Sequence, residues 1–200
     1  MDDELRGLLA GLDPDELADV IAGLPLPAAV ALLDELGGAA ASNLPATPAD
    51  MAAHLIPGFV ARPHLLYLSD RVANAVRDVE AGRNRRLIVE MPPRTGKTTL
   101  GTLVTSAWIL ARHPSWPIAL VSHDGRLATS WGRQVRRWVE AGRLGGHVKI
   151  APDAGAVGQW ETTDGGKFLS ISTRESFTGK GARVILVDDP VKDFVDAHSA

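Results

Sequence analysis

The segment that most constrains the fold is Met91–Thr98, which reads Met-Pro-Pro-Arg-Thr-Gly-Lys-Thr. It matches the Walker A pattern Gly-x-x-x-x-Gly-Lys-[Ser/Thr] at every position except the first, where Met91 replaces glycine. A short apolar run, Leu87–Met91, precedes the loop, and a helical pattern, Lys97–Arg112, follows it. The sequence therefore predicts a buried strand, a tight loop and a helix, in that order.

The residue types of this loop suit a phosphate group. Backbone N–H groups at a helix N-terminus point toward an anion there, and the helix dipole favours negative charge. Gly96 allows close approach, Lys97 would reach the β- and γ-phosphates, and the Thr98 hydroxyl would ligate magnesium. We predict a site for ATP and Mg²⁺ whose binding residues are Pro93, Arg94, Thr95, Gly96, Lys97, Thr98 and Thr99. The alternative is a turn that only caps a helix.

Two nearby positions have two interpretations each. Arg94 would stabilise charge that develops in the transition state, or it is a solvated loop residue. His64, in Arg62-Pro63-His64, would contact a nucleobase, or it is an ordinary residue at the start of a helix over Pro63–Ala81.

A second motif, of the Walker B type, supports the first. The apolar run Val184–Val187 predicts a strand that ends in Asp188 and Asp189, at the edge where open α/β sheets bind ligands. Asp188 is expected to hold Mg²⁺, and Asp189 occupies the position of the general base or water-orienting residue. The usual residue there is Glu, which is one methylene longer. Alternatively, the acids and the following proline only end a strand. The catalytic candidates are Asp189, Lys97 and Arg94.

The rest of the region predicts an α/β domain with a parallel sheet and flanking helices. A strand is expected over Pro117–Ser122 and a helix over Asp124–Ala141, with further strands considered at 147–150 and 167–172. The inward stripe of the Asp124–Ala141 helix is expected to be Leu127, Trp131, Val135 and Trp138. Its arginines, Arg126, Arg133 and Arg137, either follow a phosphate backbone or form a solvated face.

The first part of the chain predicts a small helical appendage. Leu17, Val20, Ile21 and Leu24 lie on one helical face, and a second short helix is expected over Pro27–Leu36. Gly37–Pro48 is rich in glycine and proline and predicts a linker. We therefore expect residues 1–48 to be an appendage and linker, and residues 49–200 to be the P-loop domain.

Composition limits the class of protein. A formal net charge of −3 does not indicate a general nucleic-acid binder, so any DNA contact must come from a local patch. The absence of cysteine excludes disulfides and thiolate zinc sites. No apolar run reaches the roughly 18 residues of a membrane span, so a soluble intracellular protein without a membrane partner is expected.

Several segments, in order, resemble the ATPase part of the large terminase subunit of tailed bacteriophages, over about residues 58–200. The most specific are Pro92–Thr98 and Asp188–Lys192. Supporting segments are Arg86–Met91, Ala119–His123, Gly132–Arg136, Gln159–Thr162 and Phe177–Ala182. The family's Pro-Pro-Arg loop also lacks the first glycine, but it more often has His at position 95.

This resemblance implies a RecA-like (ASCE) P-loop ATPase that drives viral DNA into a preformed capsid. It implies double-stranded viral DNA, the portal protein and the small terminase subunit as partners, and a homo-oligomeric ring. It also implies a location in the cytoplasm of the bacterial host and, transiently, at the portal vertex. By the same resemblance, Lys97 and Thr98 bind ATP and magnesium, Asp188 is the Walker B acid, and Asp189 is the catalytic carboxylate.

The sequence departs from the family at its end. Ala200 lies eleven residues beyond Asp189, so the later ATPase strands and the family's nuclease domain are expected to be absent. The sheet would then lack an interior strand, which exposes strand edges and apolar surface. We expect a weak ATPase, unstable or dependent on a complementary fragment. A helicase-like P-loop ATPase and a catalytically inactive remnant are the alternatives.

Overall fold

The computed structural model describes residues 12, 14–25, 28, 32, 44–152, 155, 158–175 and 181–191. The chain divides into two compact units, Met1–Leu44 and Pro45–Ala200. In the first unit, helix α2 (Pro14–Ala22) confirms the predicted first helix. Val20 and Leu24 on its predicted apolar face are exposed. Most of the second predicted helix, Pro27–Leu36, lies outside the described residues.

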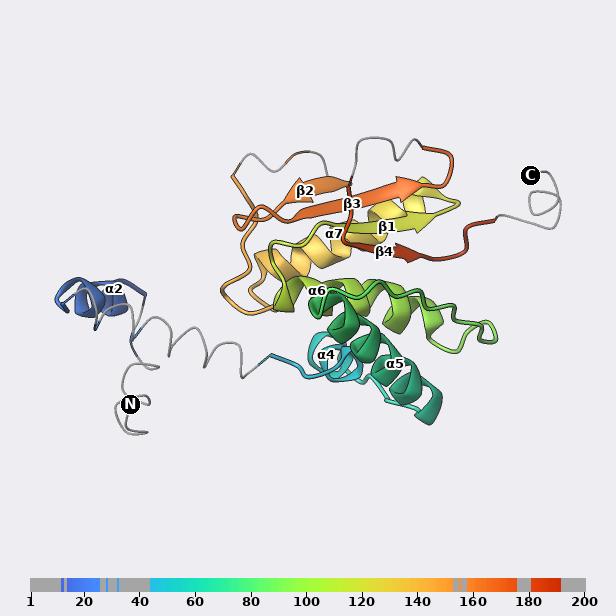
Figure 1. The fold of residues 1–200 in the computed structure, drawn as a ribbon, viewed down its shortest axis with the longest axis horizontal. Helices are drawn as coiled ribbons and strands as arrows, with labels where there is room; N and C mark the ends of the chain where they lie inside the picture. The colour runs from blue at the N-terminus through green and yellow to red at the C-terminus, as the bar shows by residue number, and fades with distance from the viewer. Residues whose placement is uncertain are drawn as a thin grey trace. The chain divides into compact units, whose positions relative to one another are not determined.

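The second unit is built on a four-stranded mixed sheet with strand order β2-β3-β1-β4 (Figure 1). Its strands are β1 (Ile118–Ser122), β2 (Gln159–Glu161), β3 (Lys167–Ser172) and β4 (Val184–Val187). β1 pairs in parallel with β3 and with β4, while β2 pairs antiparallel with β3. The α/β class and the strands predicted around positions 117–122, 167–172 and 184–187 are therefore confirmed.

Helices pack against this sheet. They are α4 (Pro48–Leu55), α5 (Pro63–Glu80), the π-helix η1 (Thr99–Val104), α6 (Thr105–Arg112) and α7 (Gly125–Glu140). α7 contacts β1 and β3, η1 contacts β4, and α4 and α5 pack on η1. The predicted helix over Lys97–Arg112 is thus present, with a π-helical segment in its first half. None of the described helices is long and apolar enough to span a bilayer.

Local capping explains where two helices begin. Thr47 and Asp50 form a reciprocal capping box at the start of α4, with Pro48 in the first turn. Asp124 accepts the backbone N–H of Arg126 at the start of α7, and this bond is the main cause of the lowered pKa of Asp124. The segment Thr47-Pro48-Ala49-Asp50 has the residues of a capping box, but helix α4 was not predicted from it.

The core lies between the sheet and its helices. Trp108 of α6, Trp160 of β2 and Phe168 of β3 are almost fully buried, and the Trp160 and Phe168 rings stack with centroids 4.7 Å apart. Trp131, Val135 and Trp138 of α7 are buried as predicted, but Leu127 is 38% exposed. The small residues Ala128 and Gly132 take the remaining inward positions, where α7 comes close to β3. Placing Leu127 on the inward stripe was therefore wrong.

The predicted strand at Leu87–Met91 is not formed. Leu87 is 42% exposed and Ile88 is 86% exposed, so the prediction of a buried strand was wrong. The physical reason is the lack of a hydrogen-bonding neighbour: the described sheet ends at β4, and Leu87–Val89 lines a cavity of about 520 Å³ together with β4 without pairing with it. The strand considered at 147–150 is also absent, apart from one bridge between Ile150 and Thr162.

Gly166 packs against the backbone of the turn that leads into β1. A Cβ atom at this position would lie 2.1 Å from the carbonyl oxygen of Pro114, which also accepts the Thr162 hydroxyl at 2.7 Å. We expect Gly166→Ala to lower the free energy of unfolding by about 1–3 kcal/mol, because backbone must move to admit the methyl group. Gly146→Ala is the control, since nothing lies within 4 Å there. Urea denaturation measures both; equal stability of the two variants would contradict the close contact.

Candidate functional site

Three predicted site residues, distant in sequence, meet at one edge of the sheet. The Lys97 Nζ lies 3.6 Å from Asp189 Oδ1 and 3.9 Å from Asp188 Oδ1. Lys97 stands in the first turn of the helix that continues into η1, and the two carboxylates follow β4 directly. The fold therefore places a cation from a helix start against two acids at the carboxyl end of a parallel strand.

The end of β4 is held by the end of β1. The backbone N–H of Asp188 donates to the carbonyl of Val121 at 2.9 Å, which extends the pairing of the two strands by one residue. Both the backbone N–H and the Nδ1 of His123 bond the carbonyl of Asp189, at 3.1 and 2.9 Å. Asp189 has a φ of +44°, an unfavourable conformation for a residue other than glycine. His123 thus helps to fix the strained turn that directs Asp189.

The loop before Lys97 is also tied to its neighbours. The Thr95 hydroxyl donates to the Pro92 carbonyl at 2.7 Å, and the His64 Nε2 lies 3.1 Å from the Thr95 carbonyl. Gly96 has a φ of +90°, and a Cβ there would meet the Leu65 side chain of α5 at 3.4 Å. His64 therefore contacts the loop itself, which gives this residue a structural role.

The loop leaves donors open at a helix start. Within the described residues, the backbone N–H groups of Thr95, Gly96 and Lys97 donate no hydrogen bond. Arg94 is exposed, with a φ of +61°, and Pro93 and Thr99 are exposed as well. The free donors and the guanidinium give this end of the helix the character of an anion-binding surface.

Asp188 has features expected of a cation ligand. The residue is only 5% exposed, and its Oδ2 atom is buried without a hydrogen-bond partner. The Oγ of Ser122, at the neighbouring end of β1, is likewise buried and unpaired. The Thr98 hydroxyl has no hydrogen-bond partner in the described part of the chain. An unpaired carboxylate oxygen and a free hydroxyl fit a hard cation such as Mg²⁺, which takes few protein ligands and completes its shell with phosphate and water.

The described residues hold no cluster of three or more acidic or histidine side chains that could bind a metal alone.

The cavity of about 520 Å³ connects this site with an apolar interior. Lys97, Asp188 and Asp189 line one part of it, while Leu68, Val76 and Ile109 belong to the apolar remainder. Pro93, Arg94, Thr95, Gly96, Thr98 and Thr99 do not line this cavity. The structure thus brings Lys97 and the two acids together at this cavity, while the other predicted loop residues lie outside its lining.

Two residues of the site were not predicted from the sequence. His123 fixes the Asp189 carbonyl, and Ser122 places an unpaired hydroxyl at the adjacent strand end. Their signal was their position at the carboxyl end of a predicted strand of a parallel sheet, Pro117–Ser122, and directly after it. Lys192 and most of Phe177–Ala182, which carried part of the family resemblance, lie outside the described residues. Comparisons with protein-family models, curated proteins and solved structures gave no significant match.

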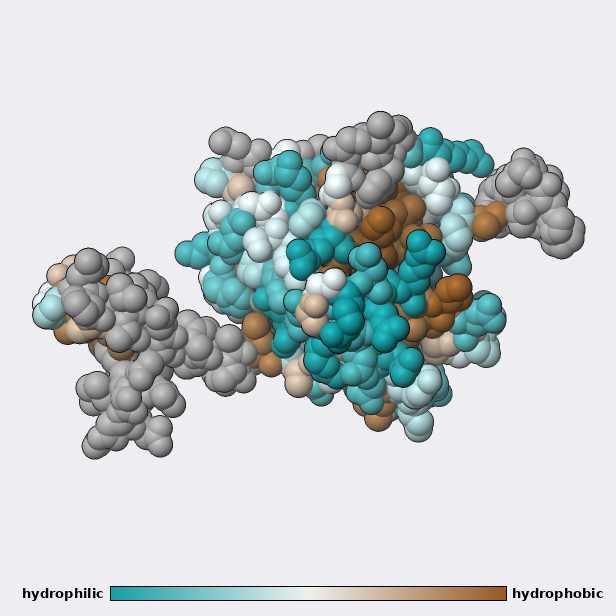
Figure 2. All heavy atoms as spheres, in the orientation of Figure 1, coloured by the Kyte–Doolittle hydropathy of each residue, from teal (hydrophilic) through white to brown (hydrophobic). Residues whose placement is uncertain are grey.

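β4 is an exposed edge of the described sheet. Among the described strands it pairs with β1 alone, and Ile185 and Val187 are 50% and 54% exposed; an apolar patch lies in this region (Figure 2). Such an edge favours pairing with another chain.

We expect Ile185→Lys to reduce concentration-dependent self-association several-fold, because a charge on an exposed edge opposes strand pairing. Val60→Lys is the control, since Val60 is 68% exposed but lies on no strand. Light scattering over a concentration series measures the effect. Equal association of both variants and the parent chain would show that the β4 edge is not the cause.

Proposed function

We propose that this chain binds ATP with Mg²⁺ and hydrolyses it, as the motor part of a phage terminase large subunit. The observation that carries the proposal is the convergence of Lys97 with Asp188 and Asp189. A lysine at a helix start and acids at the end of a parallel strand are the groups that phosphoryl transfer to water requires.

Each residue has a role in this proposal. The open N–H groups of Thr95–Lys97 and the Lys97 ammonium bind the phosphates, and ion pairing with the acids keeps Lys97 in place until a nucleotide arrives. Thr98 and Asp188 would hold Mg²⁺, which would supply positive charge opposite the phosphate oxygens. Asp189, whose side chain is 59% exposed beside Lys97, orients the attacking water. Arg94, exposed on the loop, stabilises charge that develops on the transferred group.

The terminase assignment rests on the family resemblance of Pro92–Thr98 and of the strand ending in Asp188 and Asp189. With it we propose double-stranded viral DNA, the portal protein and the small terminase subunit as partners, and action as a homo-oligomeric ring. The proposed location is the bacterial cytoplasm and, during packaging, the portal vertex.

Calorimetric titration of the chain with ATP, with and without Mg²⁺, tests the proposal together with a phosphate-release assay. We expect ATP to bind more tightly with Mg²⁺, and slow phosphate release. Binding without turnover would support an inactive remnant. The absence of binding under both conditions would overturn the nucleotide site.

A further inference from the structure

A second concavity, outside the proposed nucleotide site, is lined mainly by charged side chains. Its volume is about 490 Å³. Helix α5 and the turn that follows it supply the lining, which comprises Arg71, Asn74, Ala75, Arg77, Asp78, Arg83, Arg85, Arg86 and Leu87. Five guanidinium groups face one carboxylate there, although the chain as a whole carries a net charge of −3.

Asp78 organises this basic concavity. Its Oδ1 accepts from Arg83 at 2.5 Å and its Oδ2 accepts from Arg85, so one carboxylate holds two guanidiniums that come from the following turn. Hydrogen bonds from Arg85 and then Arg83 lower the pKa of Asp78, which keeps it charged. The Arg83 and Arg85 side chains remain 63% and 60% exposed. They are therefore positioned by Asp78 and still accessible to a ligand.

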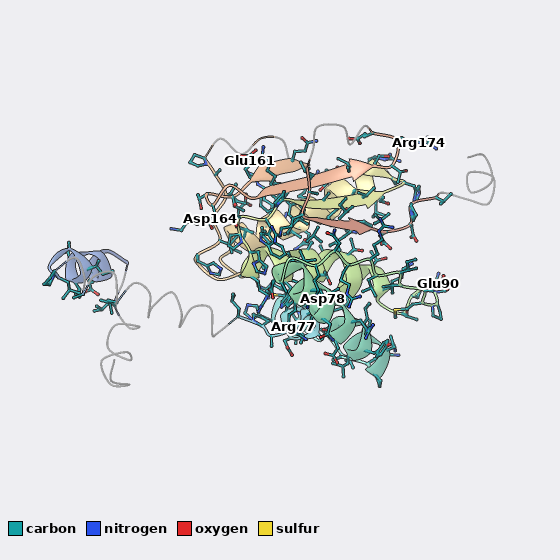
Figure 3. All side chains as sticks on the ribbon, in the orientation of Figure 1. Arg77, Asp78, Glu90, Glu161, Asp164 and Arg174 are labelled. Atoms are coloured by element: carbon teal, nitrogen blue, oxygen red, sulfur yellow. The ribbon has the colours of Figure 1, made fainter. Side chains whose placement is uncertain are left out.

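The other arginines of the concavity are not neutralised. Arg77, labelled beside Asp78 in Figure 3, donates to the Asn74 amide oxygen at 2.7 Å, which orients it without compensating its charge. Among the described residues, Arg71 and Arg86 have no ion-pair partner. The concavity therefore presents an excess of four positive charges, in the hydrophilic surface over α5 in Figure 2.

The chemistry of the lining selects among anions. Guanidinium groups bind phosphate oxygens in two-pronged hydrogen bonds, and several in one concavity suit a chain of phosphates better than a single one. The lining contains no aromatic side chain on which unpaired bases could stack. We propose that this concavity binds the phosphate backbone of double-stranded DNA. The choice of DNA over other polyanions rests on the proposed function.

The position of this surface relates it to the nucleotide site. Arg85 and Leu87 line both the basic concavity and the cavity that holds Lys97, Asp188 and Asp189. DNA bound at the concavity would thus contact the same short segment, Arg85–Leu87, that borders the proposed site of hydrolysis.

The arginines of α7 are the competing surface. Arg126 pairs with Asp124 at 3.6 Å and Arg136 pairs with Glu140 at 2.8 Å, so part of this charge is compensated within the helix. Arg133 and Arg137 are exposed and line neither cavity. They supply a matched control, because their removal changes the net charge by the same amount as removal of Arg71 and Arg86.

The test measures binding of a fluorescent 30-base-pair duplex by anisotropy over a series of salt concentrations. The parent chain is compared with the double variants Arg71→Gln/Arg86→Gln and Arg133→Gln/Arg137→Gln. We expect the first variant to bind about tenfold more weakly and the slope of log K against log salt to fall by about 1.8, which corresponds to two lost phosphate contacts. We expect the second variant to bind as the parent does. Thermal melting of all three chains checks that they fold equally.

Several outcomes would overturn the proposal. One is equal duplex binding by Arg71→Gln/Arg86→Gln and the parent. Another is a loss of duplex binding only in Arg133→Gln/Arg137→Gln. The third is tighter binding of a single-stranded oligonucleotide than of the duplex. Complete competition by millimolar inorganic phosphate would mean a small-anion site. ATP titration of the same variants separates this proposal from the proposed function. If Arg71→Gln/Arg86→Gln loses DNA binding but keeps the ATP affinity of the parent, the basic concavity binds DNA and the nucleotide site is not affected.

Discussion

Lys97→Ala is expected to weaken ATP binding by at least about 30-fold and to remove phosphate release. The lysine would make charge-assisted hydrogen bonds to phosphate, each of which contributes about 1.5–3 kcal/mol. Its ammonium also lies between the loop and the two acids, 3.6 Å from Asp189 and 3.9 Å from Asp188. Without it, the carboxylates would face the phosphates with no intervening cation, which adds repulsion to the lost bonds.

Calorimetry on the parent chain and the variant measures this effect. The matched control is Lys167→Ala, because Lys167 is 57% exposed and its one ion-pair partner among the described residues is Glu161 of β2, the strand at the opposite edge of the sheet from β4. Equal ATP affinity in Lys97→Ala and the parent would end the nucleotide assignment. Lys97→Arg is expected to restore binding only in part, since a planar guanidinium cannot replace a compact ammonium in a tight loop.

The elements that could be predicted from the sequence are those set by local signals, namely apolar runs, helical periodicity and helix caps. β1 and β4 are short apolar runs followed by polar residues, and both formed where periodicity and composition indicated. α7 has a strong apolar stripe and an Asp124 cap, and its bounds were predicted within one residue. The meeting of Lys97 with Asp188 followed from one rule, that ligand-binding groups gather at the carboxyl ends of parallel strands.

What could not be predicted depends on neighbours in space. Leu87–Met91 has the composition of a buried strand, but a strand needs a partner, and none of the described strands lies beside it. The roles of His123 and Ser122 depend on the pairing of β1 with β4, which places their polar groups next to Asp188 and Asp189. The basic concavity likewise forms only when the turn after α5 folds back on Asp78.

Asp188→Asn is expected to slow hydrolysis strongly and, unusually, to stabilise the ligand-free chain. The carboxylate is 5% exposed and its Oδ2 has no hydrogen-bond partner, so the folded protein holds an incompletely compensated charge. The amide has the same shape and no charge. Loss of the Asp188–Lys97 ion pair costs little stability, because the Lys97 side chain is 32% exposed and still faces Asp189.

We therefore expect the free energy of unfolding to rise by about 1 kcal/mol, which raises the Tm by roughly 2–4 °C for a chain of this size. Turnover should fall at least about 100-fold, since a neutral amide is a poor Mg²⁺ ligand. Asp164→Asn, at an exposed position in the turn before β3, is the control and should change neither quantity. Adding Mg²⁺ and ATP should then raise the Tm of the parent and of the control but not that of Asp188→Asn. If Asp188→Asn is less stable than the parent and Mg²⁺ with ATP still raises its Tm, Asp188 is a structural residue. A metal ligand is expected to show the opposite: its removal stabilises the empty site and weakens binding of Mg²⁺ with ATP.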